Sequence, residues 1–169
     1  ESHRFYGVDL TDIEGVGGGL ISTLMSEIGT REQLLSSFKT ADGFCAWLGL
    51  CPCNAISGGK LLSSKTRKIK NNVREALRLA AFGLEKSQSK MGEYCRRMKG
   101  RLGKASGITA TAHKIARIIY SMIASGQPYK EEIAFKPNRH IEKKQQNQLM
   151  KLAQKFGYQL TPTLNTATS

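Results

Sequence analysis

The segment Ser57-Gly58-Gly59-Lys60 contains the residue types in this chain that are best suited to chemistry. A serine hydroxyl is a potential nucleophile, and two adjacent glycines let a bulky substrate approach the backbone closely. The hydroxyl reacts only when a base, a metal or a cation eases the loss of its proton, and turn serines are common. Ser63 and Ser64 are rival candidates. Lys60 either stabilises charge that develops on a phosphate or simply begins the basic stretch that follows.

Positive charge is concentrated in one part of the chain. The 169 residues carry a formal net charge of +13, and residues 60–114 alone hold 15 Lys and Arg against 3 Asp and Glu, a balance of +12. Residues 1–59 have a balance of −4 and residues 115–169 one of +5. Such a stripe favours the DNA backbone. If it neutralised six to ten phosphates, affinity would fall roughly 10³ to 10⁵-fold between 50 and 200 mM salt.

Two alternatives to DNA binding could account for the basic stripe. A solvated basic face can serve solubility alone. A membrane-surface helix is disfavoured, because the basic segment lacks an opposite face rich in Trp and Phe. We therefore expect nucleic acid and no membrane as the partner.

Length and composition predict one soluble domain with a hydrophobic core. No apolar run approaches the roughly 18 residues that span a bilayer. The N-terminus Glu1-Ser2-His3-Arg4 has neither a signal peptide nor an initiating Met, so we expect a fragment of a longer protein. The cysteines lack zinc-site spacing, and Cys51-Pro52-Cys53 is too short a loop for an ordinary disulfide. We expect reduced, buried thiols in a cytosol at Cys45, Cys51, Cys53 and Cys95.

Helical periodicity dominates the chain and predicts an all-α fold. We expect a compact multi-helix domain with a helix-hairpin-helix-like N-terminal element and an irregular catalytic loop over Pro52 to Ser64. The polar segment from Thr161 to Ser169 is expected to be frayed. The expected helices run over 20–28, from Thr30 to Phe38, from Thr40 or Asp42 to Leu48, from Asn71 or Asn72 to Leu84, from Lys90 to Arg101, from Ser106 to Ala124 and from Arg139 to Phe156.

The helix that begins near Asn71 is expected to be amphipathic. Its apolar side packs in the core, and a polar side is available to phosphate. The apolar side consists of Val73, Leu77, Ala80, Ala81 and Leu84, and the polar side consists of Arg67, Asn71, Arg74 and Arg78.

Two more features are candidates for DNA contact, each with an ordinary structural alternative. Gly15-Val16-Gly17 precedes a helix and resembles the hairpin of a helix-hairpin-helix element, which points backbone amides at phosphate. The alternative is a tight turn that needs positive φ. His113, on one helix with Lys114 and Arg117, is either a phosphate donor and proton carrier or a half-buried structural histidine. The spacing of residues indicates neither a Ser/His/Asp arrangement nor an acidic metal cage.

A set of motifs in order resembles the C-terminal transposase domain of the insertion-sequence one-ten family. The members of this family are bacterial mobile-element recombinases, and some are guided by a bridge RNA. The resemblance runs from about Tyr6 to Tyr129. Its motifs are Gly7-Val8-Asp9-Leu10, Ile13-Glu14-Gly15-Val16-Gly17, Glu27-Ile28-Gly29, Phe44-Cys45-Ala46-Trp47-Leu48-Gly49-Leu50-Cys51-Pro52, Ser57-Gly58-Gly59-Lys60, Asn72 to Ala81 and Ala112-His113-Lys114.

The resemblance implies a division of labour between two domains. An N-terminal nuclease-like domain holds Mg²⁺ through four acidic residues, and the C-terminal domain supplies a serine nucleophile, which falls on Ser57 by motif. The implied reaction is transesterification through a covalent phosphoserine. The residues expected at DNA phosphates are Gly15, Gly17, Gly58, Gly59, Lys60, Lys65, Arg67, Lys70, Asn71, Arg74, Arg78, His113, Lys114 and Arg117.

The resemblance also implies partners and a location. DNA is the substrate, a guide RNA binds in the RNA-guided members, and the family works as an oligomer in the bacterial cytoplasm at the nucleoid. No acidic cluster for Mg²⁺ is expected in this chain, so we expect the fragment to need no cofactor, to bind nucleic acid and to lack strand-exchange activity alone. The alternative function is a non-catalytic helical DNA- or RNA-docking module that uses residues 15–19 with Arg67, Arg74 and Arg78.

The expected domain organisation follows from the same motifs. Residues 1–129 form the transposase domain, with the helix-hairpin-helix-like element at 9–29, the serine loop at 52–64 and basic helices over 67–125. Residues 130–169 form a C-terminal helix and tail with no assigned role.

Overall fold

The computed structural model describes residues 2–53, 55–63, 66–67, 69–135 and 139–158. The chain divides into two compact units, one from Glu1 to Ala134 and one from Phe135 to Ser169. Three predictions fall outside the described residues: Ser64 as a rival nucleophile, the phosphate contact at Lys65 and the frayed tail from Thr161 to Ser169.

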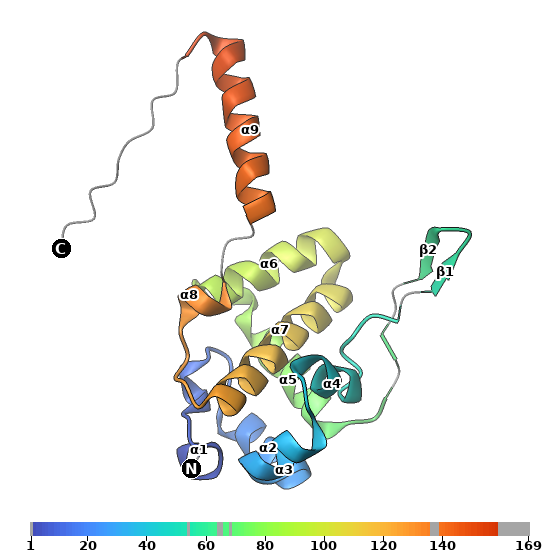
Figure 1. Ribbon diagram of the computed structural model, residues 1–169, viewed down its shortest axis with the longest axis vertical. Helices are drawn as coiled ribbons and strands as arrows, with labels where there is room; N and C mark the ends of the chain where they lie inside the picture. The colour runs from blue at the N-terminus through green and yellow to red at the C-terminus, as the bar shows by residue number, and fades with distance from the viewer. Residues whose placement is uncertain (1, 54, 64–65, 68, 136–138, 159–169) are drawn as a thin grey trace, which may run out of the picture. The chain divides into compact units, whose positions relative to one another are not determined.

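The first unit is built from helices, and the all-α class is confirmed (Figure 1). Each expected helix within it is present to within two residues at either end. Its helices are α1 (Ser2–Tyr6), the 3-10 helix η1 (Leu10–Asp12), α2 (Gly18–Ile28), α3 (Arg31–Ser37), α4 (Ala41–Trp47), α5 (Asn72–Gly83), the 3-10 helix η2 (Leu84–Lys86), α6 (Lys90–Leu102), α7 (Lys104–Ser125) and α8 (Glu131–Ala134).

Helix α7 is the centre of this unit because it packs against α4, α5 and α6 (Figure 1). Its apolar stripe recurs at helical spacing, and Ile115, Ile119 and Ile123 are completely buried. The stripe also includes Ile108, Ala112 and Met122, which are buried as well.

Helices α6 and α7 come very close at Gly107. A Cβ atom at this position would lie 2.6 Å from both Cα and N of Lys99. Only glycine therefore fits there. The Lys99 ammonium also forms an ion pair with Glu85, which links α6 to η2.

Side-chain caps fix the starts of α3, α4 and α5. The Thr30 hydroxyl accepts from Gln33 N, and the Gln33 side chain accepts from Thr30 N, which completes a capping box. Thr40, and not Asp42, caps α4 by accepting from the backbone. Asn71, and not Asn72, caps α5 in the same way. The sequence left both pairs open, because each residue type favours this position.

The segment predicted as an irregular loop contains a β-hairpin. Strand β1 (Ala55–Ser57) pairs antiparallel with β2 (Lys60–Ser63), and an isolated bridge joins Pro52 to Thr66. The prediction of irregular structure is wrong here because Gly58 and Gly59 permit a two-residue turn that brings the flanking residues into register.

The second unit contains helix α9 (Arg139–Phe156). Its described end exposes the apolar side chains of Leu149, Leu152 and Phe156. Among the residues that the structure describes, no helix is long and apolar enough to cross a membrane.

Candidate nucleic-acid interface

Ser57 lies at the end of strand β1, directly opposite Lys60 of β2. The two residues flank the turn, in which Gly58 and Gly59 have φ of 54° and 76°. Positive φ at both central positions is the geometry of a type I′ hairpin turn, which matches the twist of the strands. Ser57, Gly58, Gly59 and Lys60 are all exposed. The hairpin therefore holds a hydroxyl and an ammonium on neighbouring strands at an accessible tip.

The hydroxyl of Ser57 has no internal activation in the described part of the structure. No side-chain hydrogen bond found among the described residues involves the Ser57 hydroxyl. Lys60 is the one cation that the strand register places beside it. An ammonium stabilises an anionic phosphate but removes no proton from a hydroxyl while it is charged.

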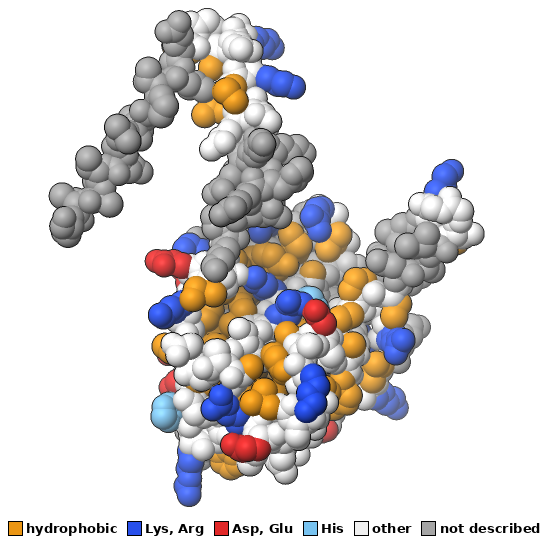
Figure 2. Space-filling view, viewed as in Figure 1, with side chains coloured by type: hydrophobic (Ala, Val, Ile, Leu, Met, Phe, Trp, Pro, Cys, Tyr) orange, Lys and Arg blue, Asp and Glu red, His pale blue; other side chains and the backbone are white. Residues whose placement is uncertain are grey.

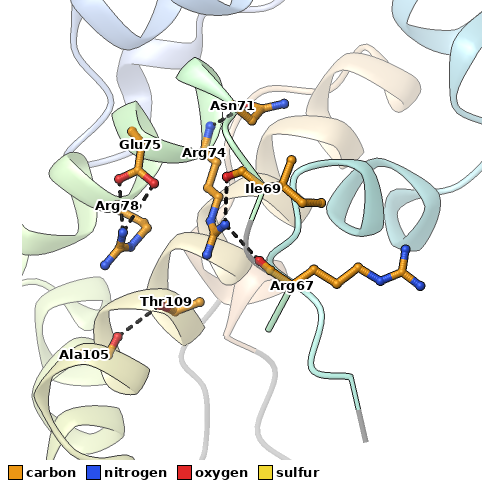
Figure 3. Close-up of polar contacts among 8 residues, drawn as sticks. All are labelled: Arg67, Ile69, Asn71, Arg74, Glu75, Arg78, Ala105 and Thr109. Atoms are coloured by element: carbon orange, nitrogen blue, oxygen red, sulfur yellow. Dashed lines mark hydrogen bonds and ion pairs between the residues drawn. The ribbon is translucent and has the colours of Figure 1, made fainter. Parts of the chain in front are cut away.

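Arg74 belongs to the interior and not to the surface. Its side chain is 9% exposed, and Nη1 donates to the carbonyl oxygens of Arg67 at 3.0 Å and Ile69 at 3.1 Å (Figure 3). The expectation that Arg74 meets phosphate is wrong, because the segment before α5 folds over its guanidinium. Arg74 instead fixes the backbone from which the Arg67 side chain extends.

The other members of the predicted polar face differ in availability. Asn71 uses its side-chain oxygen to accept from Arg74 N at 2.9 Å, so it serves as a helix cap. Arg78 forms an ion pair with Glu75 one turn earlier, at 3.1 Å (Figure 3). Arg67 and Lys70 are exposed, and no described residue pairs with either side chain.

His113 is part of a half-buried cluster that joins α7 to α4. Its Nε2 lies 3.8 Å from Sγ of Cys51, and burial, followed by the nearby Arg117 charge, lowers its pKa. Arg117 itself pairs with Asp42 of α4. A histidine with a lowered pKa is neutral at pH 7, which favours the structural alternative over a cationic phosphate donor.

The Lys114 side chain also contacts another part of the first unit. Its ammonium donates to the carbonyl oxygen of Ala134, and burial lowers its pKa.

The thiols are all free, as expected, but only Cys45 and Cys95 are buried. Cys51 is half-buried, and Cys53 is exposed.

The glycine turn near the N-terminus combines one glycine at positive φ with one in an extended conformation. Gly15 has φ of 87°, and a Cβ there would meet the Leu84 side chain at 3.1 Å. Gly17 is extended and begins α2 without a side-chain cap, so the first amides of α2 remain open. Before the turn stands the three-residue η1, which is shorter than the first helix of a helix-hairpin-helix element. The helix-hairpin-helix assignment stays a prediction.

A groove of about 590 Å³ lies where α2, α4 and the start of α5 meet the segment that follows the hairpin. It combines an aromatic ring, two cations and three polar side chains. The groove is lined by Glu27, Ala46, Trp47, Arg67, Ile69, Lys70, Asn71 and Asn72.

Trp47 is 37% exposed at this groove, whereas Phe44 and Leu48 of the same segment are completely buried. Its ring lies 5.3 Å from the Phe38 ring and 6.3 Å from the Phe44 ring, centroid to centroid. Sequence reasoning missed its accessibility, together with the lining residues Glu27 and Asn72. The helical spacing of Phe44, Trp47 and Leu48 contains no signal that distinguishes a core ring from a groove ring.

The residues described do not fit a resident metal ion. No group of three or more His, Cys, Asp or Glu side chains within the described ranges could hold one. The visible face of the molecule instead carries Lys and Arg side chains with exposed hydrophobic ones between them (Figure 2).

A comparison with protein-family models shows which family the chain belongs to. The model of the Transposase IS116/IS110/IS902 family matches residues 9–96, which is more than half of the chain. The chain belongs to this transposase family. The matched range includes the glycine turn, the serine hairpin and the groove, whereas α7 lies outside it. Neither the curated proteins nor the solved structures give a significant match to this transposase-family chain.

Proposed function

We propose that this chain is the DNA-binding and nucleophile-bearing domain of a transposase that mobilises a bacterial insertion sequence by transesterification. The observation that supports this proposal is the paired placement of Ser57 and Lys60 at an exposed type I′ hairpin within the family match. DNA follows as the substrate class from the transposase family. The +12 balance of residues 60–114 favours the same partner.

In the proposed step, Oγ of Ser57 attacks the phosphorus of a DNA phosphodiester. The new bond joins Oγ to phosphorus, and the bond from phosphorus to one bridging oxygen breaks. The proton of the Ser57 hydroxyl ends on that oxygen, which leaves as a free DNA hydroxyl. The phosphoserine keeps the ester bond, so a second DNA hydroxyl can attack it later without a nucleotide cofactor.

Lys60 supports this step electrostatically. Phosphoryl transfer places negative charge on the non-bridging oxygens, and a fixed cation beside the nucleophile stabilises that charge. Gly58 and Gly59 carry no side chain, so the hairpin tip leaves room for the DNA backbone beside Ser57.

The proposal assigns proton removal and metal binding to groups outside this chain. Ser57 has no described base beside it, and the described residues lack a metal cage. We therefore propose that the acidic residues which hold Mg²⁺ lie in a nuclease-like domain, on the same protein or on another subunit of an oligomer. A guide RNA is a further proposed partner.

Covalent trapping tests the proposal. The full-length transposase is incubated with labelled element-end DNA and Mg²⁺, with its guide RNA where one exists, then denatured and examined for a protein-linked strand. The linked strand is expected for the wild type and absent for Ser57→Ala. Ser63→Ala is the matched control, since it changes a hydroxyl on the partner strand and is expected to keep the adduct.

Three outcomes contradict the proposal. Recombination without any linked strand excludes the phosphoserine mechanism. An unchanged adduct in Ser57→Ala assigns the nucleophile to another residue. If Ser57→Ala instead loses DNA binding as well as chemistry, the chain acts as a docking module in which Ser57 is a contact.

A further inference from the structure

We propose that the groove beside Trp47 binds one unpaired nucleotide of a DNA strand. In this arrangement the base stacks on the Trp47 ring, and the adjoining phosphates lie at Arg67 and Lys70. The inference goes beyond the proposed function and rests on it only for the identity of the partner as DNA.

The Trp47 ring is a preorganised stacking platform. Phe38 and Phe44 pack against it, and Phe38 is in turn fixed by the Tyr120 hydroxyl, which donates to its carbonyl oxygen at 2.7 Å. The residue is nevertheless 37% exposed and lines the groove. An aromatic ring held by its neighbours, with part of its surface open, stacks a base at little cost in side-chain entropy.

The cations of the groove are free for a phosphate. Arg67 and Lys70 are exposed, and neither side chain pairs with a described residue. The carbonyl of Arg67 accepts from Arg74 at 3.0 Å, so the Arg67 side chain starts from a fixed point and extends away from Arg74 (Figure 3). The guanidinium is therefore available for the paired hydrogen bonds that phosphate accepts.

The rest of the lining favours a base over a second phosphate. Asn72 Nδ2 donates to Oε1 of Glu27 at 2.6 Å, and both residues line the groove. The Glu27 carboxylate repels phosphate but accepts a hydrogen bond from an amino group on a base edge. The groove thus joins a phosphate-attracting side to a side that suits only the uncharged part of a nucleotide.

Size and position indicate an unpaired DNA nucleotide. The groove volume of about 590 Å³ is within the roughly 300–1,000 Å³ of small-molecule sites. A base inside a duplex is stacked on both faces and cannot reach the ring, so the nucleotide must be unpaired. Arg67 follows Ser57 by only ten residues. The strand that the hairpin contacts is DNA under the proposed function, so DNA is also the expected strand at this groove.

Tryptophan fluorescence tests the inference directly, because Trp47 is the only tryptophan in the chain. The 169-residue chain is titrated with a short single-stranded DNA, with a duplex of the same sequence and with the matching RNA. Single-stranded DNA is expected to quench the fluorescence as the base stacks. The duplex is expected to bind through the basic surface with little quenching.

Substitutions locate the binding, with affinity measured by the anisotropy of labelled DNA. Trp47→Leu is expected to weaken single-strand binding at least about fivefold, since base stacking contributes roughly 1–3 kcal/mol. Duplex affinity is expected to stay unchanged. Lys70→Gln is expected to weaken single-strand binding, whereas Lys86→Gln, the same charge change at an exposed site outside the groove, is the control. Trp47→Phe keeps an aromatic ring and is the control for a general loss of folding in Trp47→Leu.

Several results would overturn the inference. Single-stranded DNA that binds without quenching places the strand elsewhere, and equal quenching by the duplex excludes the need for an unpaired base. Tighter binding of RNA than of DNA excludes DNA as the occupant. If single-stranded DNA quenches the Trp47 fluorescence but the full-length protein forms no covalent adduct, only the proposed function is contradicted. If the adduct forms but no quenching is seen, only this inference is contradicted.

Discussion

Nη1 of Arg74 donates to the carbonyl oxygen of Arg67 at 3.0 Å, so a residue expected at the DNA surface instead holds the backbone of another one. The same nitrogen donates to Ile69 at 3.1 Å. A buried guanidinium that bonds two carbonyls pins the segment between the serine hairpin and α5. The position of the Arg67 side chain at the groove therefore depends on an interior contact.

Replacing Arg74 tests this dependence. Arg74→Met is expected to lower the free energy of unfolding by about 1.5–3 kcal/mol, because it removes charge-assisted hydrogen bonds and leaves two carbonyls unsatisfied. DNA affinity is expected to fall as well, since Arg67 loses its anchor. Urea unfolding and DNA titration measure the two effects.

Arg78→Met is the matched control for Arg74. Its ion pair with Glu75 lies at the surface, where such pairs contribute about 0–1 kcal/mol. Equal loss of stability in both variants would contradict the structural role assigned to Arg74.

Glycine packing between α6 and α7 gives a second prediction. Gly107→Ala is expected to destabilise the protein by about 1–3 kcal/mol, because the new Cβ would overlap the Lys99 backbone at 2.6 Å. Gly100→Ala is expected to stabilise it by about 0.5–1 kcal/mol, because Gly100 lies in α6 with nothing within 4 Å of an added Cβ. Thermal unfolding of both variants measures the opposite signs. A stable Gly107→Ala protein would show that the helices do not approach so closely.

The hairpin turn gives a third prediction. Gly59→Val is expected to cost about 1–2 kcal/mol within the hairpin, because a β-branched residue is strained at φ of 76°. Gly58→Asn is expected to be tolerated, because Asn-Gly is a favoured type I′ pair. The measurement is the nuclear Overhauser contact between Ser57 and Lys60, which should vanish only in Gly59→Val. Recombination by the full-length protein should follow the same order under the proposed function.

The half-buried His113 predicts a pH dependence of stability. Burial lowers the pKa of His113 below its ordinary 6.5, so the unfolded chain binds a proton at a pH where the folded chain does not. The stability that the neutral ring supports is complete above pH 6.5 and is lost as the pH falls through the lowered pKa. Urea unfolding between about pH 7.5 and 5.5 should show this loss, above the range in which carboxylates titrate.

Variants assign that pH dependence to one residue. His113→Gln is expected to flatten the fall in unfolding free energy, and His3→Gln at an exposed position is expected to leave it unchanged. A slope that survives in His113→Gln would assign the titration to another group.

Local signals in the sequence placed most of the helices. Thr30 with Gln33 forms a capping box that can be read from four residues, and the apolar stripe of α7 repeats every three to four residues. The hairpin was also readable in principle. Gly58-Gly59 between two short segments that contain Ile56 and Leu61 is a two-residue turn signal, although a long loop was expected there.

The interface depended on contacts between distant residues. His113 meets Cys51 across 62 positions, and Asn72 meets Glu27 across 45. No local pattern states which of several arginines on a helix will be covered by a preceding segment, or which aromatic ring of a helix will border a groove. The sequence therefore did not show that Arg74 is buried or that Trp47 lines the groove.

The sequence by itself determined the helical class, the family and the position of the serine motif, because periodicity, caps and short motifs act between near neighbours. Tertiary structure alone decided which cations remain free. Among the cations predicted at phosphate, Arg74 is buried, Lys114 donates to Ala134 and Arg117 pairs with Asp42, whereas the side chains of Lys60, Arg67 and Lys70 are exposed without a described partner. Whether a cation is buried, paired or exposed depends on which surfaces meet when the helices pack. That packing depends on interactions throughout the unit and not only between near neighbours.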